Sequence, residues 1–251
     1  MRGVEHVRIS LFSAGVLLVP QVPTLGIELT LVSLLGAFIG ALAPDADAED
    51  AAIFHSRIHG VSGVRGLIIN TAAIVLPIFG YTIRYLIYYP LSLVFLAIFG
   101  KRYRHQHRGL LHSITGICLT TGILLAYIWA LFAYVGWEPL PVLPAFGIAF
   151  FCGCFFHLME DTCTPSGVAW LYPFSRVRAC GTIRTSSNFD IRPGAFTVLL
   201  ALTVAATIAA GLLDLVRPEH LTLTAAAGLM LLWLLFLAAA RVRYGGERET
   251  A

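Results

Sequence analysis

Charged side chains are scarce in this chain of 251 residues. Asp, Glu, Lys and Arg together make up only 12% of it, whereas 58% of the residues are hydrophobic. A soluble domain usually carries about 25% charged residues. This shortage excludes an ordinary water-soluble fold, so we predict a protein that crosses the membrane several times.

Cysteine is also scarce, and it lacks the spacing of a metal or redox motif. The chain has five cysteines and no CxxC pair. A disulfide framework is unfavourable in a reducing cytoplasm, so we interpret the cysteines as small residues buried in or beside the helices. A small-residue cleavage site is missing as well from the basic and apolar N-terminal stretch, which we therefore interpret as a retained first helix.

Apolar residues gather in eight stretches of unequal length. They are Ile9–Pro20, Leu25–Ala43, Leu67–Ile83, Leu86–Phe99, Leu110–Tyr134, Pro144–Met159, Phe196–Leu215 and Leu221–Ala240. A spanning helix needs about 20 apolar residues, and the first and fourth stretches are shorter than that. We predict an all-α, polytopic membrane helical bundle with six to eight hydrophobic segments.

The basic residues predict the orientation of the bundle. Under the eight-segment arrangement, Arg84 and Arg217 lie on one side of the membrane and the other 15 of the 17 basic residues lie on the opposite side. Cytoplasmic loops carry the excess of Lys and Arg. We therefore predict a multi-pass protein of the cytoplasmic membrane, with both termini and the long connections facing the cytoplasm.

The first long connection, APDADAEDAAIFHSRIHGVSG, combines carboxylates with histidines. Pro44 marks a helix end, and an extended Asp-x-Asp would project Asp45 and Asp47 to the same side, as ligands of one cation require. The alternative is a solvated acidic turn with Asp as a helix cap. His55 and His59 would share a helical face, although a solvated pair at the membrane surface is the plainer interpretation.

The second connection, KRYRHQHRGLLHS, brings histidines to the start of a span. With a helix beginning at Leu110, His112 would lie one turn inside an apolar segment, while His107 lies in the loop and His105 is a weaker candidate. Arg108 could clamp a phosphate, and the alternative is a place among lipid head groups.

The third connection begins with CGCFFHLMEDTC. His157 and Asp161 are four residues apart, on one face of a helix that ends near Pro165, so both could hold a metal such as zinc. Glu160 would point about 100° away from them, at 3.6 residues per turn. The alternative for the whole set is buried histidines bonded to backbone carbonyls.

These motifs together resemble the YdjM-like family of LexA-binding, inner-membrane-associated, metal-dependent hydrolases of bacteria and archaea. The matching residues are His6; Pro44, Asp45 and Asp47; His107, Arg108, Gly109, His112 and Ser113; and His157, Asp161, Thr164, Gly167 and Pro173. The resemblance covers about residues 1–175. It implies a membrane-embedded hydrolase-like domain at 1–175, followed by a basic loop and two C-terminal helices at 176–251.

The order of the candidate ligands along the chain also resembles the order found in the zinc-dependent phospholipase C and single-strand nuclease superfamily. That resemblance implies metal ligands at His6, Asp45, His112, His157 and Asp161, with His107 and Asp47 as further ligands or their neighbours. Those enzymes use a mature N-terminal amine as a ligand, whereas this chain begins at Met1.

The expected function is hydrolysis of a phosphate ester by metal-activated water, at a site on the cytoplasmic ends of the helices. We expect a metal held by His6, Asp45, His107, His112, His157 and Asp161, and catalytic roles for Asp45, Asp47 and Arg108. The cofactor would be one to three divalent ions, zinc or else manganese.

The expected substrate is a membrane phospholipid or a lipid-linked phosphate at head-group level, with no direct nucleic-acid binding. The small residues of the last two helices suit packing within the chain or against a second copy. Two alternatives remain at this point: a transporter that uses intramembrane His and Asp, and a non-catalytic scaffold or regulator.

Overall fold

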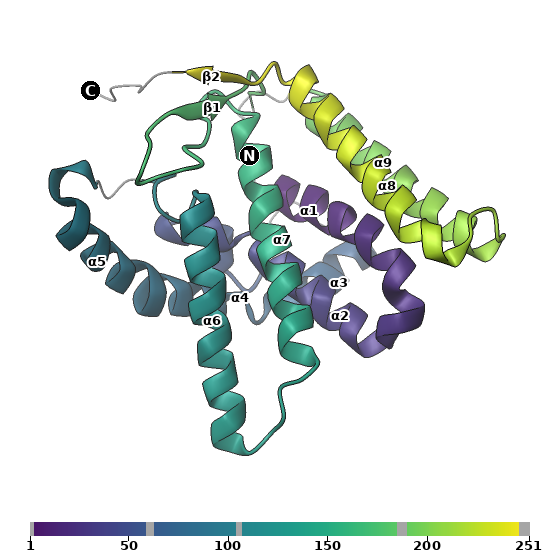
Figure 1. The fold of residues 1–251 in the computed structure, drawn as a ribbon, viewed down its shortest axis with the longest axis horizontal. Coiled ribbons are helices and arrows are strands. Elements are labelled where there is room, and N and C mark those ends of the chain that lie inside the picture. Colours follow the sequence, from purple (N-terminus) through teal and green to yellow (C-terminus); the bar gives the residue numbers. More distant parts are fainter. Residues whose placement is uncertain (1–2, 59–62, 104–106, 185–189, 246–251) are drawn as a thin grey trace.

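The computed structural model describes residues 3–58, 63–103, 107–184 and 190–245, and most of them are helical (Figure 1). The α-helices are α1 (Gly3–Leu18), α2 (Val22–Gly40), α3 (Gly63–Ala73), α4 (Leu76–Tyr81), α5 (Tyr89–Phe99), α6 (Ile114–Val135), α7 (Val142–Thr162), α8 (Arg192–Leu212) and α9 (Pro218–Ala239). The short 3-10 helices are η1 (Val19–Gln21), η2 (Ala43–Asp47), η3 (Ala52–Phe54) and η5 (Gly100–Arg102), and η4 (Thr82–Tyr88) is a π-helix. Strands β1 (Arg178–Cys180) and β2 (Arg243–Gly245) pair antiparallel. The two weaker histidine candidates, His59 and His105, lie outside the described residues.

Six helical runs in these ranges are long and apolar enough to cross a membrane, with α1 and α2 counted as one run. Large apolar side chains cover their outer faces: Leu131, Leu202 and Leu234 are 61%, 60% and 55% exposed. An apolar surface of this extent is unfavourable in water and suits lipid. The prediction of an all-α, multi-pass membrane bundle with six to eight segments is confirmed.

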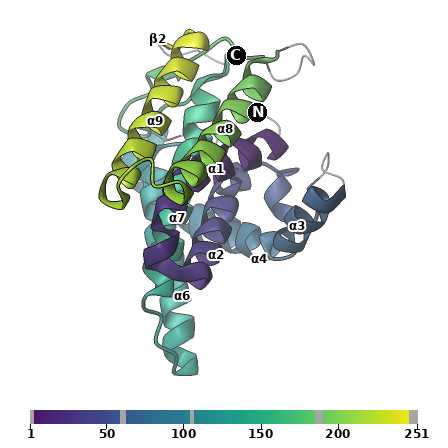
Figure 2. The same ribbon diagram turned by 90° about the vertical axis from the view of Figure 1, so that its right-hand side faces the viewer.

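The hairpin of α6 and α7 extends beyond the other helices, at the bottom of both Figure 1 and Figure 2. Its connection exposes Tyr134 and Trp137, which are 90% and 66% exposed. Tyr and Trp are enriched where a membrane meets water. The other end of the hairpin, where α6 begins and α7 ends, therefore lies toward the opposite interface, and the candidate ligands gather at that end.

Helices α2 and α7 approach so closely that glycine is required between them. A Cβ atom at Gly40 would meet the carbonyl oxygen of Phe150, and a Cβ atom at Gly153 would meet the backbone of Ala37. Small residues allow membrane helices to pack backbone against backbone. Because Gly36 faces Phe146 and Gly40 faces Phe150, the two helices run parallel, and both end at the candidate site.

The structure corrects the predicted boundaries between Leu67 and Phe99. The chain breaks after α3, and residues 76–99 then form one continuous helical run of α4, η4 and α5. Arg84, which we expected in a connection, lies inside this run, and its guanidinium carbon is 4.6 Å from the centre of the Phe54 ring. No glycine or proline stands between Ile83 and Leu86 to interrupt the helix. The predicted boundary between the two apolar stretches rested on the charge of Arg84 alone, and it is wrong for that reason.

Helices α8 and α9 form a second hairpin, which packs against α1 (Figure 2). Trp233 of α9 stacks on Phe156 of α7, with ring centres 5.8 Å apart, and its indole N–H donates a hydrogen bond to Ser13 of α1. The helices before and after residue 175 thus share one hydrophobic cluster. The division of the chain into 1–175 and 176–251 stays a prediction.

Candidate metal centre

The ends of four long helices bring the six predicted ligands together. His6 lies in the first turns of α1, Asp45 lies in η2 just after α2, and His157 and Asp161 lie in the last turns of α7. His107 and His112 lie in the turns before α6. Their ligand atoms form three overlapping groups, each within 4.8 Å: His6, Asp45 and His157; Asp45, His107 and His112; and His112, His157 and Asp161. Within the described part of the chain, these groups contain all six predicted ligands and no other residue.

Hydrogen bonding fixes the state of the His157 ring. Its Nδ1 lies 2.7 Å from the carbonyl oxygen of Ala41. A carbonyl oxygen only accepts, so Nδ1 must donate, and in the neutral ring Nε2 then carries the lone pair. This buried Nε2 has no hydrogen-bond partner among the described residues, yet it faces Asp45 Oδ1 at 3.5 Å and Asp161 Oδ2 at 3.8 Å. A lone pair and two carboxylate oxygens repel one another unless a cation lies between them.

The ring of His112 lies between two carboxylates. Its Nε2 is 3.4 Å from Asp45 Oδ1 and its Nδ1 is 3.7 Å from Asp47 Oδ2. Burial by itself would lower the pKa of His112, but Asp45 and Asp47 outweigh it and raise the pKa to about 9.

Two local predictions are wrong here. The Asp-x-Asp segment is a 3-10 helix and is not extended, so with about three residues per turn Asp45 and Asp47 leave the backbone in different directions. Asp47 accordingly pairs with His107 at 2.8 Å and belongs to none of the three groups among the described residues. The next helix begins at Ile114 because Ser113 caps it, its side chain accepting from the backbone N–H of Gly116, so His112 lies just before the helix.

Glu160 is a member of the cluster that the sequence pattern did not predict. It is fully buried, its Oε2 lies 3.0 Å from His6 Nδ1, and its Oε1 accepts a hydrogen bond from Ser10. His6 Nε2 faces Asp161 Oδ1 at 3.7 Å, and its ring stacks on His157 with centres 3.9 Å apart. The carboxyl group of Glu160 therefore lies at one edge of the His6 ring, and Asp161 lies at the other edge. An acidic residue inside a strongly apolar helix was the available signal.

Arg108 is tied to the cluster by two hydrogen bonds. Its guanidinium donates to Asp161 Oδ1 and to Thr164 Oγ1, both at 2.9 Å. It also lines a cavity of about 1000 Å³ that opens beside the cluster. Its predicted role as a phosphate clamp stays a prediction, and in this arrangement it neutralises a carboxylate.

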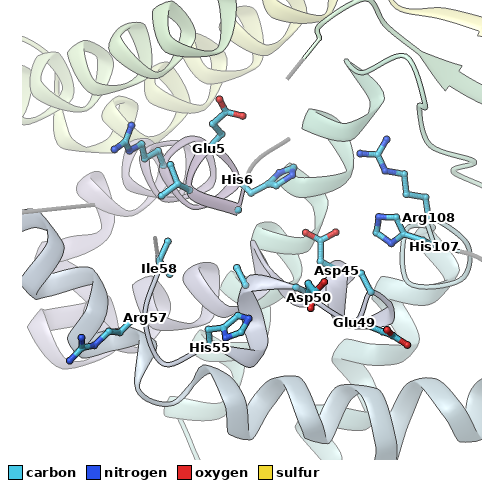
Figure 3. Close-up of a pocket in the computed structure, with 16 residues that line it drawn as sticks. Glu5, His6, Asp45, Glu49, Asp50, His55, Arg57, Ile58, His107 and Arg108 are labelled. Atoms are coloured by element: carbon cyan, nitrogen blue, oxygen red, sulfur yellow. The ribbon is translucent and has the colours of Figure 1, made fainter. Parts of the chain in front are cut away.

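This cavity gives the cluster access to solvent (Figure 3). His6, Asp45, His107 and Arg108 line one part of it, and Figure 3 shows them turned toward one another. The rest of the wall carries charged and polar side chains, which are those of Glu5, Arg8, Glu49, Asp50, His55 and Arg57. His55 is exposed and belongs to none of the three groups in the described residues.

The donor set fits a divalent ion. Two ligand atoms of tetrahedral zinc, each about 2.0–2.1 Å from the ion, lie roughly 3.3 Å apart. The distances of 3.4–3.8 Å from Asp45 and Asp161 to the rings of His112 and His157 are close to this spacing and too long for strong hydrogen bonds. Both ring nitrogens of His112 and the Nε2 of His157 are buried without a hydrogen-bond partner within the described ranges. Such atoms are costly unless a ligand meets them.

Comparison with known proteins gives one match. The family model described as YdjM inner membrane protein matches residues 1–244. The match includes α8 and α9 and therefore extends beyond the motifs, which end at Pro173. No curated protein and no solved structure matches the chain.

Proposed function

The chain belongs to the YdjM inner membrane protein family, and on this premise we propose that it is an integral membrane, metal-dependent hydrolase of phosphate esters. One observation carries the proposal: the buried lone pair of His157 Nε2 faces two carboxylate oxygens. Buried charges of this kind are paired or coordinate metals. Mixed imidazole and carboxylate ligands are typical of catalytic zinc sites.

The residues that would hold the ion or ions are His6, Asp45, His107, His112, His157 and Asp161. We propose one to three divalent ions, with zinc favoured by the imidazoles and manganese as the alternative. A divalent ion held there supplies Lewis-acid chemistry, because it makes water more acidic and polarises a phosphate ester.

The surrounding residues orient these ligands. The Ala41 carbonyl fixes the ring of His157, Glu160 fixes that of His6, and Asp47 pairs with His107. Such partners set the tautomer and direction of a ligating histidine. These orienting roles explain why Asp47 and Glu160 lie in the cluster although neither belongs to the three groups of candidate ligands in the described residues.

Asp45 and Arg108 are the residues best placed to meet a substrate, since both line the cavity. The position of Asp45 Oδ1, 3.4 Å from His112 Nε2 and 3.5 Å from His157 Nε2, favours a role for Asp45 in holding a cation over one in accepting a proton. When Asp161 ligates an ion, less of its charge remains to hold Arg108, and the guanidinium becomes available to a phosphate in the cavity.

A phospholipid or lipid-linked phosphate is the substrate class that the position favours. The cluster lies at the ends of membrane-spanning helices, and its cavity carries Arg8, Arg57 and Arg108. The excess of basic residues at this end supports a position on the cytoplasmic side. The order of ligands, which resembles that of the zinc-dependent phospholipases C and nucleases, is in keeping with phosphate-ester chemistry.

The ligand positions also favour a hydrolase over a transporter. Transporter sites lie near the middle of the bilayer on interrupted helices. Here the ligands lie at the first turns of α1, the last turns of α7 and the turns that follow α2 and precede α6.

A hydrolysis assay on the full chain in detergent tests the proposal. Wild type, His112→Ala, Asp161→Asn and the control His220→Ala would be loaded with zinc or manganese and given three substrates: 4-nitrophenyl phosphate, bis(4-nitrophenyl) phosphate and phosphatidylglycerol in mixed micelles. His220 is an exposed histidine at the start of α9, far from the ligands in sequence. We expect hydrolysis by wild type and His220→Ala, and background rates in the other two at unchanged helix content. Absence of hydrolysis by metal-loaded wild type on all three substrates would contradict the proposal.

A further inference from the structure

The short β1–β2 ribbon gathers basic side chains on one face. Arg178 pairs with Gly245, and Cys180 pairs with Arg243. Directly opposed residues in an antiparallel pair project to the same side, and so do residues two apart on one strand. Arg178 and Arg243 are therefore diagonal neighbours on one face of the ribbon. Like charges at such positions repel.

This face is one wall of a second cavity, of about 430 Å³, which also has Arg241 and Thr182 in its lining. Gly245 faces Arg178, and a Cβ atom at Gly245 would have no atom within 4 Å, so the space beside the arginines is open. Arg241 has a φ of +51°, the left-handed conformation that commonly ends a helix, and its N–H donates to the Ala238 carbonyl at the end of α9. The volume lies within the usual range of small-ligand sites, about 300–1,000 Å³.

Among the described residues, the three arginines have no acidic partner. Within the described ranges no carboxylate lines this cavity, and Arg178, Arg241 and Arg243 form no ion pair there. Asp190, which belongs to the adjoining segment, is bonded instead to Arg192 at 2.6 Å. Three guanidinium groups that line one cavity without a carboxylate from the described residues form a site for an anion.

Backbone hydrogen bonds place this cavity at the ends of the membrane helices. The N–H of Gly181 donates to the Thr164 carbonyl just after α7, and the N–H of Thr182 donates to the Ala240 carbonyl just after α9. The arginines therefore lie at the level where a span leaves the bilayer. Phosphate groups of lipids are the anions concentrated there.

We propose that the cavity formed by Arg178, Arg241 and Arg243 binds a phosphate-bearing anion, separately from the metal cluster. Guanidinium groups match phosphate oxygens through paired N–H bonds, and three of them neutralise its charge. The phosphate belongs either to a lipid head group or to a free ion. Arg178 also donates hydrogen bonds to the carbonyls of Gly167 and Arg108. It therefore stabilises the loops that contain these two residues in addition to binding the anion.

Titration of the full chain in detergent tests the site, with two probes: inorganic phosphate and dioctanoyl phosphatidic acid. The variant is Arg241→Gln with Arg243→Gln, because both side chains are exposed and Arg178 is left to support the loop. The matched control is Arg217→Gln, an exposed arginine at the other end of α9. A further variant, His157→Ala, identifies any binding that belongs to the metal cluster.

We expect the double variant to bind the anion at least about tenfold more weakly, since it loses charge-assisted hydrogen bonds. Arg217→Gln should bind as wild type does, His157→Ala should keep the binding that the double variant loses, and the double variant should keep its metal content. Binding of phosphatidic acid alone identifies a lipid head group, and equal binding of both probes identifies the phosphate group itself. The proposal is overturned if neither probe binds wild type, if the double variant binds as tightly as wild type, or if only His157→Ala loses binding.

Discussion

Helices α2 and α7 differ from helices α8 and α9 in how they meet the rest of the molecule. Half of the most apolar window of α7 is buried, against 17% for α8 and 22% for α9. The backbones of α2 and α7 touch at Gly40 and Gly153, whereas α8 and α9 meet through aromatic rings such as Phe196 and Phe236, with ring centres 4.1 Å apart. Candidate metal ligands lie at the ends of the first pair, and among the described residues none lies on the second.

The difference shows where the centre obtains its precision. Metal ligands must be held within about 0.5 Å of their working positions by residues that cannot move. The contact between α2 and α7 supplies this directly, because the hydrogen bond from His157 to the Ala41 carbonyl extends across it. The α8–α9 hairpin faces lipid over most of its surface and imposes no comparable constraint.

The largest expected effect on stability is that of truncating a buried leucine in the pair of helices α2 and α7. Leu158 of α7 is fully buried, so Leu158→Ala leaves a cavity and should cost about 2–5 kcal/mol of stability. Leu234→Ala on α9 is the matched change at a side chain that is 55% exposed, and it should cost no more than about 0.5 kcal/mol. Thermal unfolding in detergent measures both. Equal losses would remove the distinction between the two pairs.

A smaller effect is expected at the glycine contact. Gly40→Ala places a methyl group against the Phe150 carbonyl and should cost about 1–3 kcal/mol. The control is Gly228→Ala on α9, where a Cβ atom has no atom within 4 Å; it should be neutral or stabilising, because alanine favours the helix. Thermal unfolding and metal content should fall together in the first variant. A fully stable Gly40→Ala protein would show that the close approach is not required.

The smallest of these effects concerns affinity and not folding. Glu160→Gln keeps the shape of the side chain but replaces the carboxyl group that lies 3.0 Å from His6 Nδ1, and loss of such a partner typically weakens metal binding about 10–100-fold. The matched control is Glu219→Gln, an exposed position at the start of α9. Competition with a chelator of known affinity measures the change. If Glu160→Gln binds metal as tightly as wild type, Glu160 does not position His6.

The sequence was sufficient for the class of fold and for the gathering of the histidines and aspartates at one end of the helices. Apolar stretches and few charges predict a helical membrane protein, and histidines and aspartates at the ends of those stretches predict a cluster. His157 and Asp161 were predictable together because a spacing of four residues places them on one face of a helix.

Contacts between helices were not predictable in this way. Glu160 points away from His157 on α7, but α1 packs beside α7 and brings His6 between Glu160 and Asp161. The charge of Arg84 predicts a connection at this position, and the ring that accommodates it in the helix, that of Phe54, lies 30 residues away in the sequence. In both cases the neighbour that decides the position of the side chain comes from another element of the fold. The periodicity of residues along one helix gives no information about such a neighbour.

Elemental analysis of the full chain, purified in detergent without chelator, tests the central claim most directly. Wild type would be compared with His157→Ala and with His220→Ala as the matched control. We expect zinc or manganese at one ion per chain or more in wild type and His220→Ala, and a clear loss in His157→Ala because the lone pair of Nε2 is removed. Wild-type protein without bound metal, or His157→Ala with the same metal content as wild type, would contradict the account.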